Sequence, residues 1–432
     1  MFEPPRGMDD LLPDEMRVKR RIEETIREVF RLYGYDEIET PTLEYRSLFE
    51  AKSGDEIRHR MFTLQDMHGR VLALRPEVTA SVARVVATRM KSAPTPIRLG
   101  YIADCYRYDE PQWGRRRRFW HGGFEIFGST DPLSDAEIMI ASNEVFKRLG
   151  LTNIRFKTGH VGIMRGILSE QGVDERIQDS FLNMLDRKMV DEAFSLLSEH
   201  CHDATVIGAI RMLSQLSGDE KIFSSARDVV ASWPTAAKAL ENFEEIIGIA
   251  RDLIKDESRI TIDFGFARGL EYYTGFIFEQ YVDGLDIAFN GGGRYDKLVE
   301  IFGGKHTPGV GCAIGITRIQ TYLMQKAVGS IQQSARIFVS VLSDKVRSYA
   351  FKVAQIVRSR GMAAELDVTR KRLSAAFEYC EKKRIKYMLV VGEKEAAEDK
   401  AALRNLETRE QIEVPLSQLG EFVENLLRSG LS

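Results

Sequence analysis

The sequence predicts a multidomain protein of mixed α+β and α/β class, and three observations support that prediction. The chain has 432 residues, more than a single hydrophobic core usually supports. Strand-like runs dominate the beginning of the chain, vanish from about residue 161 to 255, where apolar residues recur every three or four positions, and then return. From about residue 335 onward, strand-like and helical segments alternate regularly, which is typical of a small α/β domain.

The first part of a sheet-based domain is predicted over residues 1–160. It opens with a helix over about residues 14–33, because apolar residues recur there at helical spacing and Gly34 is placed to end it. A short strand follows and is expected to end at Pro41, because proline has no backbone N–H to donate within a central sheet ladder. The patterns then predict a hairpin over residues 61–73, a helix from about Glu77, two strands within residues 96–128, a helix over 134–149 and a strand over 154–158.

Three further segments follow along the chain. Residues 161–257 are predicted to form a helical insertion, and residues 258–328 to complete the interrupted sheet domain, with a closing helix from Gly315 to Met324. Residues 335–432 are predicted to form a separate α/β domain with a mostly parallel sheet.

Composition and charge narrow the class of protein. Hydrophobic residues make up 44% of the chain and charged residues 29%, which is typical of a globular protein with a substantial core. No run approaches about 18 apolar residues and the N-terminus lacks a basic start, so we expect a cytoplasmic protein without membrane contact. A net charge of −3 predicts that nucleic acid is bound only through local basic patches. The scattered cysteines predict neither a disulfide framework nor a metal site.

A strongly basic loop joins the two strands within residues 96–128. It contains Gln112 and the run Arg115–Arg118, and Phe119 follows directly. Guanidinium groups suit bidentate contacts to phosphate, and an aromatic face can stack on a base. The loop is therefore either a contact to a nucleotide or RNA, or a solvated hairpin tip.

Arg107 and Asp109 precede that loop. Strand alternation places both on one face, and Glu125 is expected opposite them on the second strand. Such a set is either a structural ion network or a polar substrate site.

Three glycine-containing segments, residues 266–275, 290–296 and 309–318, stand out further along the chain. The first suggests a backbone that bends around a ligand. The triple glycine of the second is either a phosphate cradle or a tight turn, and the small residues of the third allow close packing against a flat ligand.

In order and spacing, these segments resemble the class II aminoacyl-tRNA synthetases and, among them, the histidyl-tRNA synthetase family. RGMDDLLPDEM and GYDEIETPTLE resemble the N-terminal signature and motif 1, YRYDEPQWGRRRRFWHGGFEIFG resembles motif 2, and GVGCAIGITRI resembles motif 3. ARGLEYYTG and GGGRYDKLV resemble two signatures peculiar to the histidine enzymes. The resemblance covers essentially the whole chain. It implies an antiparallel-sheet catalytic domain with a helical insertion, followed by an α/β anticodon-binding domain.

The resemblance implies ATP-dependent activation of histidine to histidyl-adenylate and transfer to tRNA(His). Arg107 matches the arginine on the α-phosphate and carboxylate, Arg268 the arginine that faces the α-phosphate from the other side, and Arg318 the arginine on the γ-phosphate. Their charges suit a reaction in which two anionic groups meet. Phe119 would stack on adenine near Asp109. Mg²⁺ is implied on the ATP phosphates rather than in a protein cage.

The resemblance also implies which residues hold histidine. Glu77 and Thr79 match residues that hold the α-amino group. Glu125 and Tyr273 match those that grip the imidazole, whose donor and acceptor nitrogens a carboxylate and a phenol can satisfy. Arg107 and Arg268 are implied at the carboxylate. The remaining implied pocket residues are His121, Tyr272 and Tyr295.

Contacts to larger partners are implied as well. Gln112 and Arg115 are expected to touch the tRNA acceptor end, and motif 1, which ends in Pro41, implies a homodimer. The chain departs from the family pattern at Asp109, Arg116, His121 and Glu271. Because these substitutions keep polarity, we interpret them as lineage variation.

Other functions fit parts of the pattern. A histidine-sensing regulatory subunit of ATP phosphoribosyltransferase would share the fold, but such paralogues generally lack the anticodon module and lose catalytic arginines. A class II synthetase for threonine, proline or glycine would share motifs 1 to 3 without the histidine signatures. A protein that only binds RNA would leave Arg107, Arg268 and Arg318 without a role.

Overall fold

The structure is a computed structural model that describes residues 2–51, 54–254, 259–267, 272–326, 336–369 and 371–428. The chain divides into two compact units, Met1–Lys326 and Ala327–Ser432. Within the described ranges, no helix combines the length and the apolar character needed to pass through a membrane.

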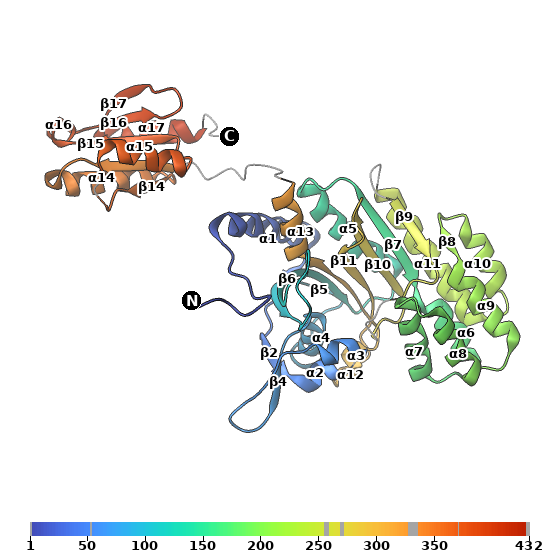
Figure 1. The fold of residues 1–432 in the computed structure, drawn as a ribbon. Helices are drawn as coiled ribbons and strands as arrows, with labels where there is room; N and C mark the ends of the chain where they lie inside the picture. Colours follow the sequence, from blue (N-terminus) through green and yellow to red (C-terminus); the bar gives the residue numbers. More distant parts are fainter. Residues whose placement is uncertain are drawn as a thin grey trace. The chain divides into compact units, whose positions relative to one another are not determined.

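A nine-stranded sheet forms the centre of the first unit, with the strand order β1-β5-β6-β12-β11-β10-β7-β9-β8 (Figure 1). Neighbouring strands from β5 to β7 in this order are antiparallel, whereas β1 pairs with β5 and β7 pairs with β9 in parallel. The strands are β1 (Asp36–Glu37), β5 (Ile97–Tyr106), β6 (Arg118–Phe127), β7 (Ile154–His160), β8 (Ser217–Gly218), β9 (Arg259–Asp263), β10 (Phe276–Val282), β11 (Ala288–Arg294) and β12 (Gly309–Gly315). The antiparallel catalytic-domain sheet that the resemblance implies is therefore confirmed.

The triple glycine, residues 291–293, lies within the buried strand β11. It forms an extended strand, so the interpretation as a tight turn was wrong, whereas contact with a phosphate stays a prediction. A Cβ added at Gly292 would overlap the carbonyl oxygen of Gly311 on β12. Glycine is needed here because the two backbones approach more closely than any side chain allows.

Three helices, α1 (Pro13–Tyr33), α5 (Pro132–Arg148) and α13 (Ile316–Gln325), pack together and against the central strands. The predicted periodicity of α1 is confirmed, since Ile22 and Ile26 are completely buried. Gly34 ends the helix with a left-handed φ of +71°, which glycine adopts without strain. Asp131 begins α5 by accepting the backbone N–H of Leu133 at 2.9 Å.

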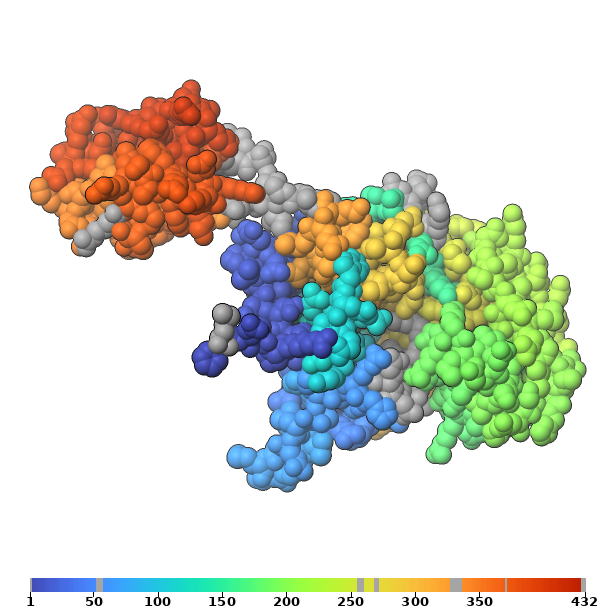
Figure 2. Space-filling model, viewed as in Figure 1, coloured from blue at the N-terminus to red at the C-terminus, as the bar shows by residue number. Residues whose placement is uncertain are grey.

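The helices expected between β7 and β9 are present. They are α6 (Val161–Glu170), α7 (Glu175–Asp186), α8 (Val190–His200), α9 (Ala204–Gln215), α10 (Ile222–Val230) and α11 (Pro234–Leu253). Figure 2 shows them, in green to lime, as one body. Phe243 of α11 joins this body to the sheet, because its ring centroid lies 5.4 Å from that of Phe223 on α10 and 6.0 Å from that of Phe276 on β10.

A small three-stranded sheet, β2-β4-β3, precedes β5, the first long central strand, in the sequence. It consists of β2 (Leu43–Tyr45), β3 (Thr63–Gln65) and β4 (Val71–Leu74), and β3 and β4 form the predicted hairpin. Short helices α2 (Arg46–Glu50), α3 (Gly54–His59) and α12 (Leu298–Ile301) accompany helix α4 (Thr79–Arg89), which begins two residues after the predicted Glu77.

The second unit is an α/β domain with the strand order β14-β13-β15-β16-β17. Its elements are β13 (Arg336–Val341), a 3₁₀ turn (Asp344–Val346), α14 (Arg347–Ser359), β14 (Ala363–Leu366), α15 (Leu373–Lys382), β15 (Tyr387–Val391), α16 (Glu393–Ala397), β16 (Lys400–Asn405), β17 (Gln411–Pro415) and α17 (Leu416–Arg428). On one face of the sheet, buried side chains of α14 and α17 form a core with Ile337 and Val339 of β13. On the other face, buried side chains of α15 form a second core with Phe338 of β13. Helices therefore cover both faces of the sheet.

That sheet is mixed, so the predicted mostly parallel sheet was wrong. Strand β13 is parallel to β14 and β15, but β16 is antiparallel to both β15 and β17. The missed strand is β16, in which only the short run 401–403 is buried. Two of those three residues are alanines, whose low β-propensity and small size hid the strand.

Candidate functional site

A cleft of about 420 Å³ opens in the first unit, a size that suits a small molecule. Strands β5, β6, β10, β11 and β12, the start of α4 and the loop between β5 and β6 contribute to its walls. The cleft brings together most of the residues singled out in the sequence. Those that line it are Glu77, Thr79, Arg107, Asp109, Arg115, Phe119, His121, Tyr272, Tyr273, Tyr295 and Arg318.

Glu125 is completely buried in β6, in contact with two of the residues that line the cleft. Thr79 Oγ1 donates a hydrogen bond to its Oε1 at 2.7 Å, and the hydroxyl of Tyr295 donates to its Oε2. Burial raises the pKa of Glu125 to about 8, although both hydrogen bonds lower it. A Cβ added at Gly311, which faces Glu125 on β12, would overlap Oε2. The glycine of this strand therefore makes room for a buried carboxyl group.

The structure corrects the expected placement of Glu125 opposite Arg107. Glu125 pairs with Leu99, and β5 already ends at Tyr106. Arg107 lies one residue beyond the strand, where its backbone N–H donates to the carbonyl of Arg117 at 2.9 Å. The expectation was wrong because alternation fixes the face on which a side chain lies but not the register between two strands.

Glu77 lies just before α4 and is buried. Its carboxylate accepts the backbone N–H of Ala80 at 3.0 Å, which satisfies one of the open donors at the start of the helix. Burial raises the pKa of Glu77 to about 7, against the lowering effects of that N–H and of the charge on Arg107. Two buried carboxyl groups with raised pKa values thus lie at one cleft, Glu77 in its lining and Glu125 directly behind it.

Arg107 and Asp109 enter the cleft from the loop after β5. Arg107 Nε donates to the carbonyl of Pro76 at 2.9 Å, and its guanidinium lies 5.4 Å from the ring centroid of Phe119. Asp109 accepts a hydrogen bond from Arg60 at 3.0 Å. Arg60 also lines the cleft and was not predicted, because no local pattern connects the end of α3 with this loop.

Arg318 reaches the cleft from the first turn of α13. Its Nε donates to the carbonyl of Gly114 at 3.4 Å and its Nη1 to the carbonyl of Ala288, so it connects the basic loop with β11. Thr317 beside it accepts the backbone N–H of Trp120 at 2.9 Å, which fixes the start of the helix to β6.

His121 lies on β6 on the same face as Phe119 and Glu125, as strand alternation requires. Its ring centroid is 4.9 Å from that of Phe119, and its Nδ1 is 4.0 Å from Cys105 Sγ. Burial raises the pKa of Cys105 to about 12, so this thiol stays protonated at neutral pH. Tyr101 of β5 also lines the cleft and was not predicted.

Tyrosine rings form one wall of the cleft. The ring centroids of Tyr272 and Tyr273 lie 4.9 Å apart, and those of Tyr272 and Tyr295 lie 5.7 Å apart. All three tyrosines are buried. They present phenol hydroxyls along this wall, next to the buried carboxyl group of Glu125.

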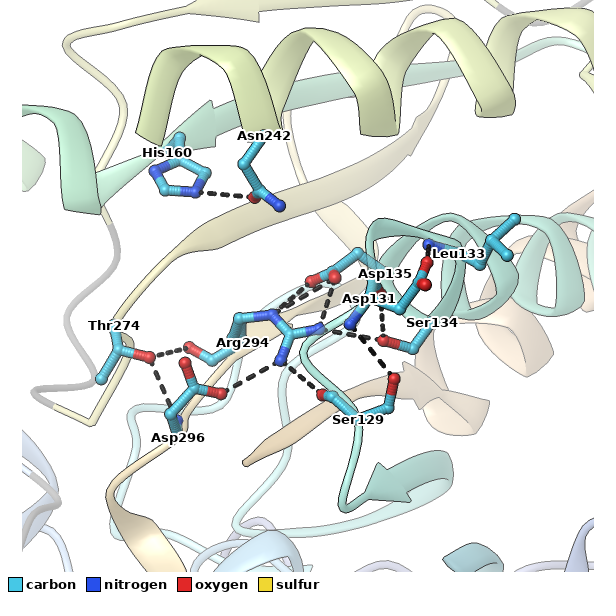
Figure 3. A network of polar contacts seen from close by, with 10 residues as sticks. All are labelled: Ser129, Asp131, Leu133, Ser134, Asp135, His160, Asn242, Thr274, Arg294 and Asp296. Carbon is cyan, nitrogen blue, oxygen red and sulfur yellow. Dashed lines mark hydrogen bonds and ion pairs between the residues drawn. The ribbon is translucent and has the colours of Figure 1, made fainter. Parts of the chain in front are cut away.

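Arg294, next to Tyr295, belongs to a buried network that was not predicted (Figure 3). Its Nε donates to Asp135 of α5 at 3.0 Å, and its Nη1 donates to the carbonyl of Ser129 at 2.8 Å and to Asp296 at 3.1 Å. Its own carbonyl accepts the backbone N–H of Thr274 at 2.8 Å. The network ties the segment after Tyr273 to the end of β11.

The remaining predicted residues lie elsewhere. Arg268 and Glu271 fall outside the described residues. Gln112 is exposed at the loop tip and does not line the cleft. Its backbone N–H and carbonyl form a pair of hydrogen bonds with the backbone of Arg115. Among the residues that the structure describes, no group of three or more His, Cys, Asp or Glu is placed to hold a metal ion.

Comparison with known proteins adds to this geometry. Residues 7–319 match the family model described as histidyl-tRNA synthetase, and residues 336–426 match that of an anticodon binding domain.

Individual relatives agree with these family matches. The histidine–tRNA ligase of Archaeoglobus fulgidus is 37% identical over 426 residues, which cover 98% of this chain and 100% of the relative. That of Methanocaldococcus jannaschii is 35% identical over 423 residues, covering 98% and 99%. A crystal structure of histidyl-tRNA synthetase from Nostoc sp. PCC 7120 superposes with a TM-score of 0.79 at 23% identity, with 99% of each chain covered, and thus shares the fold.

Proposed function

The chain belongs to the histidyl-tRNA synthetase family, a class II aminoacyl-tRNA synthetase family, and we propose that its cleft forms histidyl-adenylate before histidine is transferred to tRNA(His). The chain is a histidine–tRNA ligase. The single observation that supports the proposed site best is the buried carboxyl of Glu125. Thr79 and Tyr295 hold it directly beside a cleft that they line together with Arg107 and Arg318.

Histidine occupies the part of the cleft around Glu125. Its imidazole has one donor and one acceptor nitrogen when neutral, and Glu125 together with Tyr273 supplies complementary groups. Glu77 takes up the α-ammonium group, aided by Thr79 at the start of α4. Tyr272, Tyr295 and His121 complete the walls of the pocket.

ATP occupies the part of the cleft near the basic loop. The reaction joins the carboxylate of histidine to the α-phosphorus and expels pyrophosphate, so negative charge accumulates where the two anions meet. Arg107 acts on the carboxylate and the α-phosphate, and Arg318 on the γ-phosphate. Phe119 stacks on adenine, where the guanidinium of Arg107 already lies 5.4 Å from its ring. Asp109, paired with Arg60, contacts the adenine end of this site.

In this proposal Mg²⁺ would accompany the ATP and would be held through its phosphates. The residues of the cleft fit this role, because Glu279 and Asp286 line it and add carboxylate oxygens, which Mg²⁺ prefers as ligands. The ion neutralises phosphate charge when bound.

Arg268 lies outside the described residues, and the family pattern places its charge at the α-phosphate. Replacement of Arg268 by alanine should lower kcat far more than it weakens histidine binding, because the charge matters most in the transition state. An equal loss in kcat and in histidine affinity would mean that Arg268 only binds substrate.

The tRNA contacts two parts of the chain. Gln112 and Arg115 of the exposed loop touch the acceptor end, and residues 335–432 bind the anticodon. Replacement of both loop residues should therefore slow aminoacylation and leave adenylate formation unchanged. Unaltered aminoacylation in that variant would contradict the assignment.

The chain acts as a cytoplasmic homodimer in this proposal. Exposed apolar side chains support an interface near motif 1, since Leu32 of α1 and Leu43 and Tyr45 of β2 are 50%, 41% and 49% exposed. Light scattering of the full chain should give twice the mass of 49.1 kDa. A monomer at micromolar concentration would contradict it.

A regulatory subunit without aminoacylation is not favoured. Such a protein was expected to lack the anticodon module, but residues 336–426 match one and the curated ligases align over nearly their full length. The direct test is ATP–pyrophosphate exchange with each amino acid in turn. Histidine alone should stimulate exchange strongly. Exchange with another amino acid, or with none, would contradict the proposed function.

A further inference from the structure

A second cavity, of about 480 Å³, lies beyond the tyrosine wall of the cleft. Helices α6, α7 and α11 line it on one side, and the segment Tyr272–Gly275 and the residues after β11 line it on the other. Tyr272 and Tyr273 line both cavities. Its volume lies in the range of small-molecule sites, and none of the substrates assigned to the cleft needs it.

His160, at the end of β7, presents a buried acceptor in this cavity. The side chain is 8% exposed, and its Nε2 lies 3.3 Å from Oδ1 of Asn242. A carboxamide oxygen only accepts, so Nε2 carries the proton and Nδ1 has the free lone pair of a neutral ring. Among the described residues, Nδ1 has no hydrogen-bond partner, and Figure 3 shows it on the side of the ring that faces away from Asn242. Burial and the charge of Arg294 lower the pKa of His160 to about 4, which keeps the ring neutral.

The approach to that acceptor is open because residue 162 is a glycine. A Cβ at Gly162 would lie 3.1 Å from Nδ1 of His160 and 3.2 Å from the carbonyl oxygen of Thr274. Any side chain there would crowd the space in front of the imidazole. A buried acceptor with a clear approach and no donor among the described residues is available to a donor from outside the chain.

Four basic side chains line the same cavity together with the two carboxylates Glu175 and Asp296. Arg165 of α6 lines it, and its Nη2 donates to Asp179 at 2.5 Å, but its buried Nε has no partner among the described residues. Lys238 of α11 lines the cavity and is exposed. Lys297 also lines it, held to Glu175 at 3.1 Å. Guanidinium and ammonium groups in such an arrangement suit a carboxylate or phosphate.

We propose that this second cavity binds a compact anionic molecule that also carries a hydroxyl or amino donor, such as a small phosphate ester or hydroxy acid. The donor bonds to Nδ1 of His160, and the anionic group lies between Arg165 and Lys238. The site is distinct from the histidine and ATP cleft, from which Tyr272 and Tyr273 separate it.

Calorimetric titration of the full chain with glycerol 3-phosphate tests the proposal. This probe should bind, whereas sulfate, an anion without a donor, and glycerol, a donor without charge, should each bind at least about tenfold more weakly. Replacement of His160 by phenylalanine removes the acceptor and should weaken binding at least about tenfold. Lys238→Ala alters an exposed side chain, so it should weaken binding without disturbing the fold.

Two further variants serve as controls. Lys221→Ala removes a 93% exposed lysine that does not line the cavity, and it should bind the probe like the unmodified chain. Arg107→Ala should also leave binding unchanged, even if the proposed adenylate chemistry proves wrong. Absence of binding up to about 10 mM probe, equal binding in the His160 and Lys238 variants, or loss of binding in the Arg107 variant would each overturn the proposal.

Discussion

Thr79 donates a hydrogen bond to Glu125 across 2.7 Å, although one residue begins helix α4 and the other lies within strand β6. Tyr295, from the segment after β11, donates to the other oxygen of the same carboxyl. Three distant parts of the chain thus meet at one buried group. This convergence gives the pocket a fixed polar centre, and several predictions depend on it.

Glu125→Gln should weaken histidine recognition selectively. The amide nitrogen would face a hydroxyl donor, so the pocket would lose a charge-assisted hydrogen bond and acquire an unpaired group. We expect KM for histidine in pyrophosphate exchange to rise by about 100-fold, about 2.7 kcal/mol, with KM for ATP nearly unchanged. Thr79→Ser keeps the hydroxyl and should behave like the unmodified chain. A parallel rise in KM for ATP would show that Glu125 acts on the whole cleft.

Histidine binding should release protons at neutral pH. Burial raises the pKa of Glu77 to about 7 and that of Glu125 to about 8, so both are partly protonated in the empty pocket. An ammonium ligand favours the ionised carboxylates, and affinity should therefore increase as the pH rises from 6 toward 8. Titration calorimetry at pH 7.5 in two buffers of different ionisation enthalpy measures the release. Proton uptake would contradict the assignment, and Glu125→Gln should reduce the release.

The same raised pKa values affect the stability of the empty protein. In the unfolded chain these carboxyl groups ionise near their ordinary pKa of 4.5, but in the folded chain only near 7 and 8. Between pH 4.5 and about 8 the folded state therefore binds more protons than the unfolded state. The stability that these two carboxyl groups contribute at low pH is lost as the pH rises through this range.

Most of the helices and strands could be predicted from the sequence, because long periodic segments such as residues 14–33 bury one face. Strands β8 and β16 could not. Strand β16 buries mainly alanines, and β8 has only two residues. The direction of strand pairing in the second unit was also missed, because it depends on which elements pack together rather than on any local pattern.

The candidate site was predicted as a set of residues but not as a geometry. Motif positions identified Glu77, Arg107 and Glu125, whereas the register that sets Glu125 against Leu99 appears only in the folded sheet. The pairing of Asp109 with Arg60 likewise joins segments with no common pattern. Long-range contacts of this kind depend on the tertiary fold and not on local sequence.

Gly311→Ala should abolish most histidine activation although it adds a single methyl group. The new Cβ would overlap Oε2 of Glu125, whose carboxyl is held on both oxygens and cannot move aside. We expect kcat/KM for histidine to fall by at least about 100-fold in pyrophosphate exchange. Gly248→Ala is the matched control, since nothing lies within 4 Å of a Cβ added there and alanine suits the interior of α11. Similar activity in both variants would contradict the prediction.

Arg294→Met should destabilise the first unit, because it leaves the completely buried carboxyl of Asp135 without its partner. We expect a loss of about 3–5 kcal/mol at pH 7.5, the range for breaking a buried ion pair. Burial raises the pKa of Asp135 to about 6 even with Arg294 present, and removal of the guanidinium raises it further. The variant should therefore lose less stability near pH 5, where Asp135 is protonated in both proteins.

Urea unfolding followed by tryptophan fluorescence measures the effect of Arg294→Met in the first unit, since all three tryptophans, Trp113, Trp120 and Trp233, lie there. Arg227→Met is the control, because Arg227 is exposed in its ion pair with the partly buried Glu244, and this pair should contribute less than about 1 kcal/mol. The double variant Arg294→Met with Asp135→Asn should recover part of the loss, since the unpaired charge is then absent. Equal destabilisation by Arg294→Met and Arg227→Met would mean that the buried network contributes no more to stability than a surface pair.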